Sequence, residues 1–157
     1  MLRLFIALMM CLMPTGANAR ASGMAQGKFS TLSYERLQRL PPAIHKAFKA
    51  AQLLCRDDAI NVRTGFLRYL KGKKDVEFIA IHFDQLECLD RNALCSPNGC
   101  LHRVFVSNRG ILREVWRGDV LEIDMSTESG IPSIDVDCSR SGSFCHYQMQ
   151  WNGKRFR

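Results

Sequence analysis

Histidine and carboxylate side chains are the groups in this chain that could support acid–base chemistry. Asp84, Glu87 and Asp90 form a local acidic cluster, and His102 and His146 each lie close to a cysteine. A carboxylate and an imidazole together can move protons during hydrolysis, so one hypothesis is a small hydrolase whose site contains Asp84, Glu87 and His102. The sequence has no G-x-S-x-G, H-E-x-x-H or phosphate-loop motif, which favours a non-catalytic protein instead.

A thiol nucleophile paired with a histidine would need a free cysteine. Apart from Cys11, which lies in the N-terminal apolar run, the cysteines are even in number: Cys55, Cys88, Cys95, Cys100, Cys138 and Cys145. In an exported chain this count predicts three disulfides. The spacings include no C-x-x-C pair, so the sequence predicts no zinc site, and it indicates no other metal and no cofactor.

The positions of these cysteines favour one of the 15 pairings that six cysteines allow. The last two flank a six-residue turn, and Cys95 and Cys100 bracket the turn sequence Ser-Pro-Asn-Gly. This leaves Cys55 for Cys88, a disulfide that would fasten a predicted helix to a predicted sheet. The pairing is a preference, since the other combinations stay open.

The first nineteen residues have the three parts of a secretory signal: a basic start at Arg3, an apolar run over 4–13 and an Ala-x-Ala site that ends at Ala19. About ten apolar residues are too few for a transmembrane helix, which needs about 20. We therefore expect a signal peptide over 1–19, cleavage after Ala19, and a protein in the periplasm or secreted with no transmembrane segment. A lipoprotein anchored at Cys11 is the alternative, but the residues before this cysteine are not the small ones that a lipobox requires.

The formal net charge of +7 is unevenly distributed along the chain. Residues 20–74 contain twelve Lys and Arg against three Asp and Glu, whereas residues 75–102 contain one against five. Exposed basic side chains can bind anionic polymers or acidic proteins, and nucleic acid is not expected as the partner of an exported protein. The alternative is that the acidic segment 75–102 folds against the lysines and neutralises them.

The leading hypothesis is a non-catalytic envelope protein that binds an envelope protein partner or an anionic envelope polymer, and its rival is a small envelope hydrolase with the carboxylate and histidine site. We expect a monomer. The candidate binding residues are basic positions of a predicted helix and a predicted hairpin turn, together with two tryptophans that we expect to be exposed: Lys46, Lys49, Lys73, Lys74, Trp116 and Trp151.

Hydrophobic periodicity predicts a single domain over 33–157, preceded by a flexible leader over 20–32. One or two helical turns are expected before the two prolines at 41 and 42. Pro42 suits the first turn of a second helix, because its missing N–H is not needed there. Apolar residues recur at spacings of three and four from Ile44 to Cys55, so we expect that face of the helix to pack on a core.

From Val62 onward, short apolar runs separated by turn residues predict strands. Residues 65–70 and 76–83 flank a turn over 71–75, which indicates a hairpin with a central second strand. We expect His82 on that strand to be a hydrogen-bonded core residue. The expected fold class is α+β, with one or two N-terminal helices followed by a seven- or eight-stranded antiparallel β-meander stapled by disulfides.

A cysteine ends the predicted helix, a cysteine-rich segment closes on Asn98-Gly99-Cys100, and the chain ends with Trp151-Asn-Gly-Lys-Arg-Phe156 before its last arginine. In this order the motifs, from about residue 40 to 157, resemble small exported cysteine-rich bacterial proteins of unknown function, loosely similar to the FG-GAP/VCBS repeats of integrin-type propellers. Such repeats bind calcium in an Asp-x-Asp-Gly-Asp loop. The matching stretch here, 70–75, has lysines where the acids would be, and because calcium needs several oxygen ligands, we expect no calcium site there.

Overall fold

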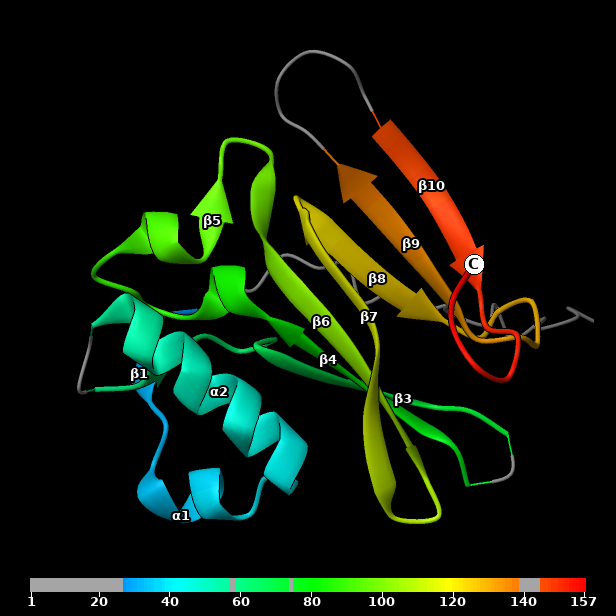
Figure 1. Ribbon diagram of the computed structural model, residues 1–157, viewed down its shortest axis with the longest axis horizontal. Helices are drawn as coiled ribbons and strands as arrows, with labels where there is room; N and C mark the ends of the chain where they lie inside the picture. Colours follow the sequence, from blue (N-terminus) through cyan, green and yellow to red (C-terminus); the bar gives the residue numbers. More distant parts are fainter. Residues whose placement is uncertain (1–26, 57–58, 74, 139–144) are drawn as a thin grey trace, which may run out of the picture.

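The computed structural model describes residues 27–56, 59–73, 75–138 and 145–157, and it confirms an α+β fold (Figure 1). Two helices precede most of the strands, and seven strands of five or more residues follow them in the described part of the chain. The elements are β1 Ser30–Thr31, α1 Tyr34–Gln38, α2 Pro42–Cys55, β2 Asn61–Val62, β3 Leu67–Lys71, β4 Glu77–His82, the 3₁₀ turns η1 Phe83–Gln85 and η2 Arg91–Ala93, β5 Cys95–Ser96, β6 Gly99–Asn108, β7 Ile111–Val120, β8 Glu122–Ser126, β9 Ser133–Cys138 and β10 Cys145–Gln150.

Helix α2 forms where the apolar spacing predicts it. Pro42 occupies its first turn, and its buried face runs from Ile44 through Phe48 to Cys55. The helix ends at Arg56, whose φ of 54° lies in the left-handed region and stops the helical hydrogen-bond ladder. The buried face therefore docks α2 on the central sheet and delivers Cys55 to the core.

The central sheet has the order β3-β4-β6-β5, with β7 also paired to β6, and all of these pairs are antiparallel. Strand β4 is buried from Phe78 to His82, because alternate side chains of a strand point to opposite faces and both faces of this sheet are covered. Ile79 and Ile81 pack in the cluster that includes α2, whereas Phe78 and Ala80 pack in a second cluster.

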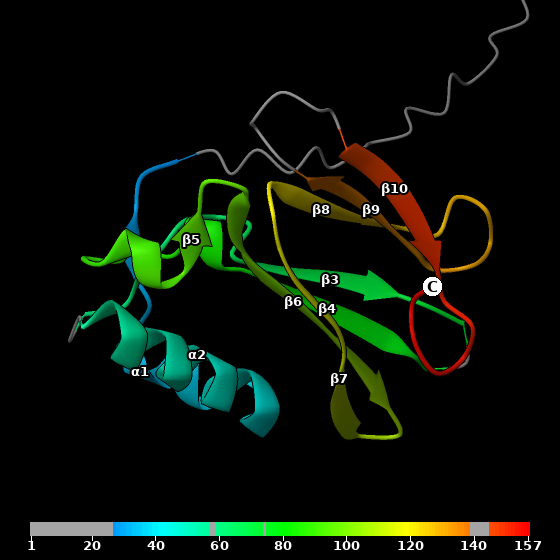
Figure 2. The same ribbon diagram turned by 45° about the horizontal axis from the view of Figure 1, so that its top comes forward.

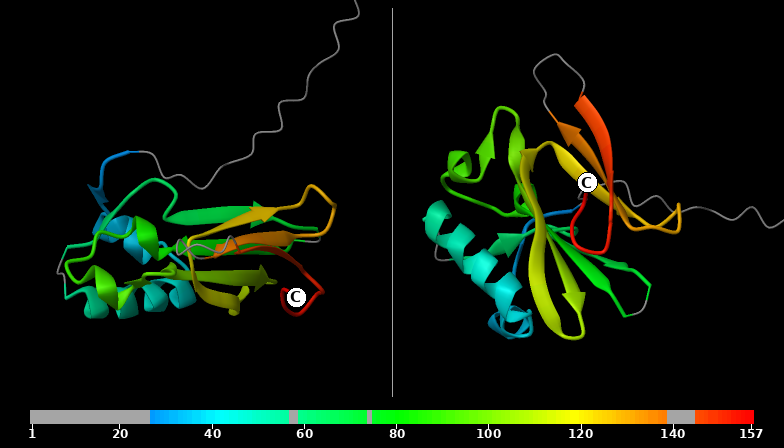
Figure 3. Two further views of the ribbon diagram at one scale, coloured as in Figure 1. Left: turned by 90° about the horizontal axis from the view of Figure 1, so that it is seen from above. Right: turned by 45° about the vertical axis from the view of Figure 1, so that its right-hand side comes forward.

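The second cluster lies between the central sheet and a separate three-stranded sheet of order β10-β9-β8. Figure 2 shows α2 below the central sheet and β8, β9 and β10 above it, and the right-hand view of Figure 3 also has α2 and the last strands on opposite sides of the molecule. The predicted antiparallel strands are thus present, and they are divided between sheets that stack. Side chains from β8 and β9, among them Ile123, Ile134 and Val136, are buried in this layer.

The described part of the predicted leader contains an ordered segment. Ser30 and Thr31 form β1, which pairs antiparallel with Asn61 and Val62 of β2. The Leu32 N–H also donates to the Ile60 carbonyl, at 2.8 Å. The ordered domain therefore begins a few residues before the expected boundary at residue 33.

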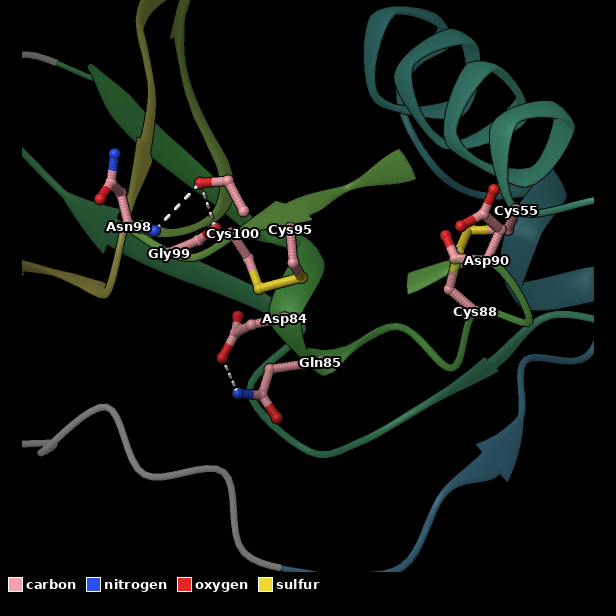
Figure 4. Close-up of a disulfide and its surroundings, with 10 residues drawn as sticks. Cys55, Asp84, Gln85, Cys88, Asp90, Cys95, Asn98, Gly99 and Cys100 are labelled. Carbon is pink, nitrogen blue, oxygen red and sulfur yellow. Dashed lines mark hydrogen bonds between the residues drawn. A yellow bond between two sulfur atoms is a disulfide. The ribbon is translucent and has the colours of Figure 1, made fainter. Parts of the chain in front are cut away.

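The three disulfides pair as the spacing favours: Cys55–Cys88, Cys95–Cys100 and Cys138–Cys145. The last two join residues that face each other across antiparallel strands, β5 with β6 and β9 with β10. The Cys55–Cys88 disulfide ties the end of α2 to the segment that follows η1 (Figure 4). In the described residues, no helix is long and apolar enough to cross a membrane.

Candidate functional site

Two buried histidines lie side by side at one end of the central sheet. His82 ends β4, His102 lies in β6, and the strand register places the two directly opposite each other. Their ring centroids are 5.1 Å apart and the rings are nearly perpendicular. His82 and His102 lie two residues from Ala80 and Val104 on the same faces of their strands, so both imidazoles point toward the layer that contains β8 and β9.

Asp84 joins this pair from the turn η1, two residues after His82. Ligand atoms of the three side chains all lie within 4.8 Å of one another. In the described part of the chain, Nε2 of His82, both ring nitrogens of His102 and Oδ1 of Asp84 are buried without a hydrogen-bond partner of normal geometry. The other Asp84 oxygen, Oδ2, accepts a hydrogen bond from the Gln85 side chain. Buried polar atoms without partners are costly and uncommon, so this group is a candidate site.

Burial keeps both imidazoles neutral near pH 7. Loss of hydration lowers the pKa of His82 from 6.5 to about 3, and His102 and Arg68 reinforce the shift. Loss of hydration also lowers the pKa of His102, although the charges of Asp84 and Asp119 and the Val120 backbone oppose it. Neutral imidazoles have a free lone pair, which is the form that binds metals or accepts protons.

Glu122 of β8 lies near Asp84 and near other carboxylates. Burial raises the pKa of Glu122, and the nearby Asp124 and Asp84 add to this rise while Arg68 opposes it. Arg68 of β3 forms a salt bridge with Asp124 of β8, at 3.5 Å. The salt bridge partly offsets the positive charge of Arg68, which still contributes to the lowered pKa of both imidazoles.

A cleft of about 470 Å³ opens beside this group, and Asp84 forms part of its lining. The Cys95–Cys100 disulfide, Arg91 and Gly99 line it as well. Figure 4 shows Asp84 next to the Cys95–Cys100 disulfide, with Gln85 on its other side. Asp84 thus connects the buried histidines to a space that a small molecule or water can enter.

The structure brings together two of the three residues of the predicted hydrolase site. Asp84 and His102 are neighbours, but Glu87 is exposed and accepts a hydrogen bond from the Asn61 side chain, at 2.8 Å. His82, which was expected to be a hydrogen-bonded core residue, takes the third place instead. The sequence signal for including His82 was its spacing from Asp84, a histidine and an aspartate two residues apart at the end of a predicted strand. This spacing indicates a site only once the strand register places His102 opposite His82.

The candidate basic residues do not form one patch. Lys46 and Lys49 are exposed on α2. Lys73 lies in the β3–β4 turn, and its Nζ atom is close to Gly130, 4.0 Å from where a side chain on that residue would begin. Figure 1 shows α2 and this turn on opposite sides of the molecule. Lys74 lies outside the described residues.

The ion pairs of the described residues do not join Lys46, Lys49 or Lys73 to the acidic segment 75–102. Those that form are Arg68–Asp124, Arg103–Glu114, and His146 with Asp135 and Asp137. Direct salt bridges to the acidic segment therefore do not neutralise the three described lysines.

The two tryptophans are partly buried, although they were expected to be exposed. Trp151 makes an edge contact with Phe78, at 5.1 Å between ring centroids, and also contacts Phe156. The ring of Trp116 lies over Gly118, so close that an added Cβ would be 2.8 Å from it. Both tryptophans pack against the cluster between the two sheets, and this packing accounts for much of their surface.

No protein-family model, no curated protein and no solved structure matches this chain. The resemblance to FG-GAP/VCBS repeats therefore stays a prediction. The function has to be argued from the arrangement of the residues themselves.

Proposed function

We propose that the protein is a non-catalytic envelope protein, located in the periplasm or secreted after cleavage at Ala19, that binds an anionic envelope polymer through its helical face. An acidic envelope protein is the alternative partner. The proposal assigns the binding to a monomer and to the surface that α1 and α2 present to solvent. The tryptophans contribute to stability in this proposal more than to binding, because they are packed against the core.

The observation that carries this proposal is a set of exposed basic side chains on neighbouring helices. Lys46 and Lys49 are exposed three residues apart on α2, and Arg36 and Arg39 are exposed three residues apart at α1. Residues at this spacing lie on the same side of a helix. α1 lies beside α2 (Figure 1), and in this proposal the four cations together bind a polymer with repeated negative charges.

A charge-reversal experiment tests this surface. We expect the double variant Lys46→Glu, Lys49→Glu to elute from an immobilised lipopolysaccharide or anionic-glycan column at clearly lower salt than the wild type. Retention of the wild type should itself fall steeply between about 0.05 and 0.2 M salt, because the Debye length is about 10 Å at 0.1 M. Melting temperature should stay unchanged, since both lysines are exposed.

The matched control is Lys73→Glu, which makes the same kind of charge change on the opposite side of the molecule. It should alter retention much less than either helix substitution alone. Equal effects from Lys73→Glu and Lys46→Glu would show that net charge alone decides retention. A fall in melting temperature without a change in retention would show that the helix lysines are neutralised within the fold, and either result would contradict the proposal.

The second candidate function is a small envelope hydrolase, which the proximity of Asp84 and His102 beside an open cleft favours. Asp84 lines the cleft and His102 is buried behind it, so the carboxylate could act as a general base toward a water molecule in the cleft while the imidazole positions it. Turnover of chromogenic ester, phosphoester or glycoside substrates that disappears in both Asp84→Asn and His102→Gln would support it. Absence of turnover in the wild-type protein would favour the non-catalytic proposal.

A further inference from the structure

We propose that His82, Asp84 and His102 bind a divalent transition-metal ion, with Zn²⁺ as the best match. This site is separate from the helical surface, and it does not depend on the attachment function. Two imidazole nitrogens and one carboxylate oxygen are a donor set that Zn²⁺ and its neighbours in the first transition row accept. The lysine-rich turn 71–75, by contrast, offers no comparable set.

The position of the unpartnered atoms is the first argument. His82 and His102 are 4 % and 0 % exposed, so their ring nitrogens cannot rely on bulk water. The atoms that lack partners among the described residues include one on each of the three side chains, and these side chains offer ligand atoms within 4.8 Å of one another. Ligand atoms of a tetrahedral zinc site lie about 3.4 Å apart, so small side-chain rotations about an ion would satisfy all three.

The supporting groups are the second argument. Metal ligands are usually oriented by hydrogen bonds from groups behind them. The Gln85 side chain already holds Oδ2 of Asp84, which leaves Oδ1 to face the histidines. Both ring nitrogens of His102 are buried without a hydrogen-bond partner of normal geometry among the described residues, so either nitrogen is available to the ion.

The local charge is the third argument. Glu122 lies near Asp84 and near Asp124, and Arg68, a cation that acts on both histidines, is salt-bridged to Asp124 at 3.5 Å. A divalent cation would relieve the repulsion among these carboxylates. The same attraction raises the local concentration of cations around the site.

The cleft beside Asp84 gives the ion a route to the site. Three protein ligands leave a fourth position for water or a small ligand, which is the arrangement of an open zinc site. Asp84 lines the cleft of about 470 Å³ and belongs to the ligand group. Water or a small ligand could therefore approach the ion past Asp84.

The competing explanation is that the two imidazoles are only a packed pair. Their rings meet edge to face at 5.1 Å, which is a favourable aromatic geometry in itself. Under that explanation the three side chains have no preference for metal ions, and removal of the Asp84 charge would not change metal binding.

The experiment uses the disulfide-bonded protein after treatment with a chelator and dialysis. Calorimetric titration with Zn²⁺ should show one ion bound per chain, and titration with Co²⁺ should give visible absorption bands of a low-coordinate site. Asp84→Asn and His102→Gln should each weaken binding by at least about 100-fold, since even loss of a supporting group costs about 10–100-fold. Circular dichroism establishes that both variants are folded.

His146→Gln is the matched control, because His146 is an exposed histidine with its own carboxylates, Asp137 at 2.8 Å and Asp135 at 4.0 Å. It should leave Zn²⁺ affinity unchanged. Loss of binding in His146→Gln but not in Asp84→Asn would place the ion at the surface and overturn the proposal, as would a wild-type protein that binds neither ion at 0.1 mM. Asp84→Asn should keep its retention on anionic polymer, and Lys46→Glu, Lys49→Glu should keep its Zn²⁺ affinity, so failure of one proposal is distinguishable from failure of the other.

Discussion

The burial of the His82 imidazole makes the folded protein sensitive to acid. The pKa of His82 falls to about 3 in the fold, against 6.5 for the exposed side chain. Between these two values the unfolded chain binds a proton that the folded chain does not. The free energy of unfolding must therefore fall as the pH falls from 6.5 toward 3, by up to about 1.4 kcal/mol per pH unit from this residue.

We predict that the wild-type protein is less stable at pH 4.5 than at pH 7, with a contribution from His82 of at most about 3 kcal/mol. Urea unfolding at the two pH values, with a chelator present, measures the difference. In His82→Gln the difference should shrink. An unchanged pH dependence in His82→Gln would contradict the buried, neutral state of this imidazole.

At the scale of elements, the contact between the start of β6 and the end of β7 depends on one glycine. Gly99 has a φ of 141°, and a Cβ atom at this position would lie 2.1 Å from the backbone carbon and oxygen of Val120. The positive φ and the close contact with the Val120 backbone both exclude an L side chain at this position. Gly110, in the turn between the same strands, has a φ of 79° but no atom within 4 Å of an added Cβ.

We predict that Gly99→Ala is strongly destabilising, by well over the about 1 kcal/mol that a positive φ alone costs an alanine. Gly110→Ala should cost only about that amount. Denaturant midpoints of the two variants provide the comparison. Equal losses would mean that β6 and β7 do not approach each other this closely.

The turn between β3 and β4 leads to a prediction about calcium. Lys71, Lys73 and Asp75 are exposed there, and Asp75 adopts a φ of 59°, as a tight chain reversal requires. Calcium binding needs several oxygen ligands around one point. We expect the melting temperature to be the same with and without millimolar calcium, and a clear rise that is lost in Asp75→Asn would refute this.

At the scale of the whole molecule, the disulfides differ in how much chain they close. Cys55–Cys88 spans 33 residues and Cys95–Cys100 spans 5. On the loop-entropy model these correspond to about 4 and about 2 kcal/mol of stabilisation. The longer loop also joins the end of α2 to the segment that follows η1, so its loss removes a covalent link between the helix and the rest of the fold.

We predict that replacing Cys55 and Cys88 by alanine lowers the free energy of unfolding more than replacing Cys95 and Cys100. Thiol titration of the denatured, non-reduced chain 20–157 should find essentially no free thiol. One reactive thiol per chain would contradict the three-disulfide framework. A larger loss of unfolding free energy on removal of Cys95–Cys100 than on removal of Cys55–Cys88 would show that the short disulfide stabilises the fold by more than loop closure.

Much of the fold follows from the sequence because the information is local. The apolar spacing from Ile44 to Cys55 determined α2, and the runs on either side of 71–75 determined the β3–β4 hairpin. The cysteine spacing favoured the pairing that the structure shows, since turn sequences bring neighbours together. These features depend on residues that are close in the chain.

The candidate metal site and the division into two stacked sheets were decided only by the tertiary structure. His82 and His102 are far apart in sequence, and a shift of one residue in the pairing of β4 with β6 would separate them. The tryptophans are partly buried because the second sheet packs over the first, which no local pattern encodes. Register and layer packing arise from many contacts between distant segments, so the sequence alone placed Asp84 and His102 in one hypothesis but could not bring in His82.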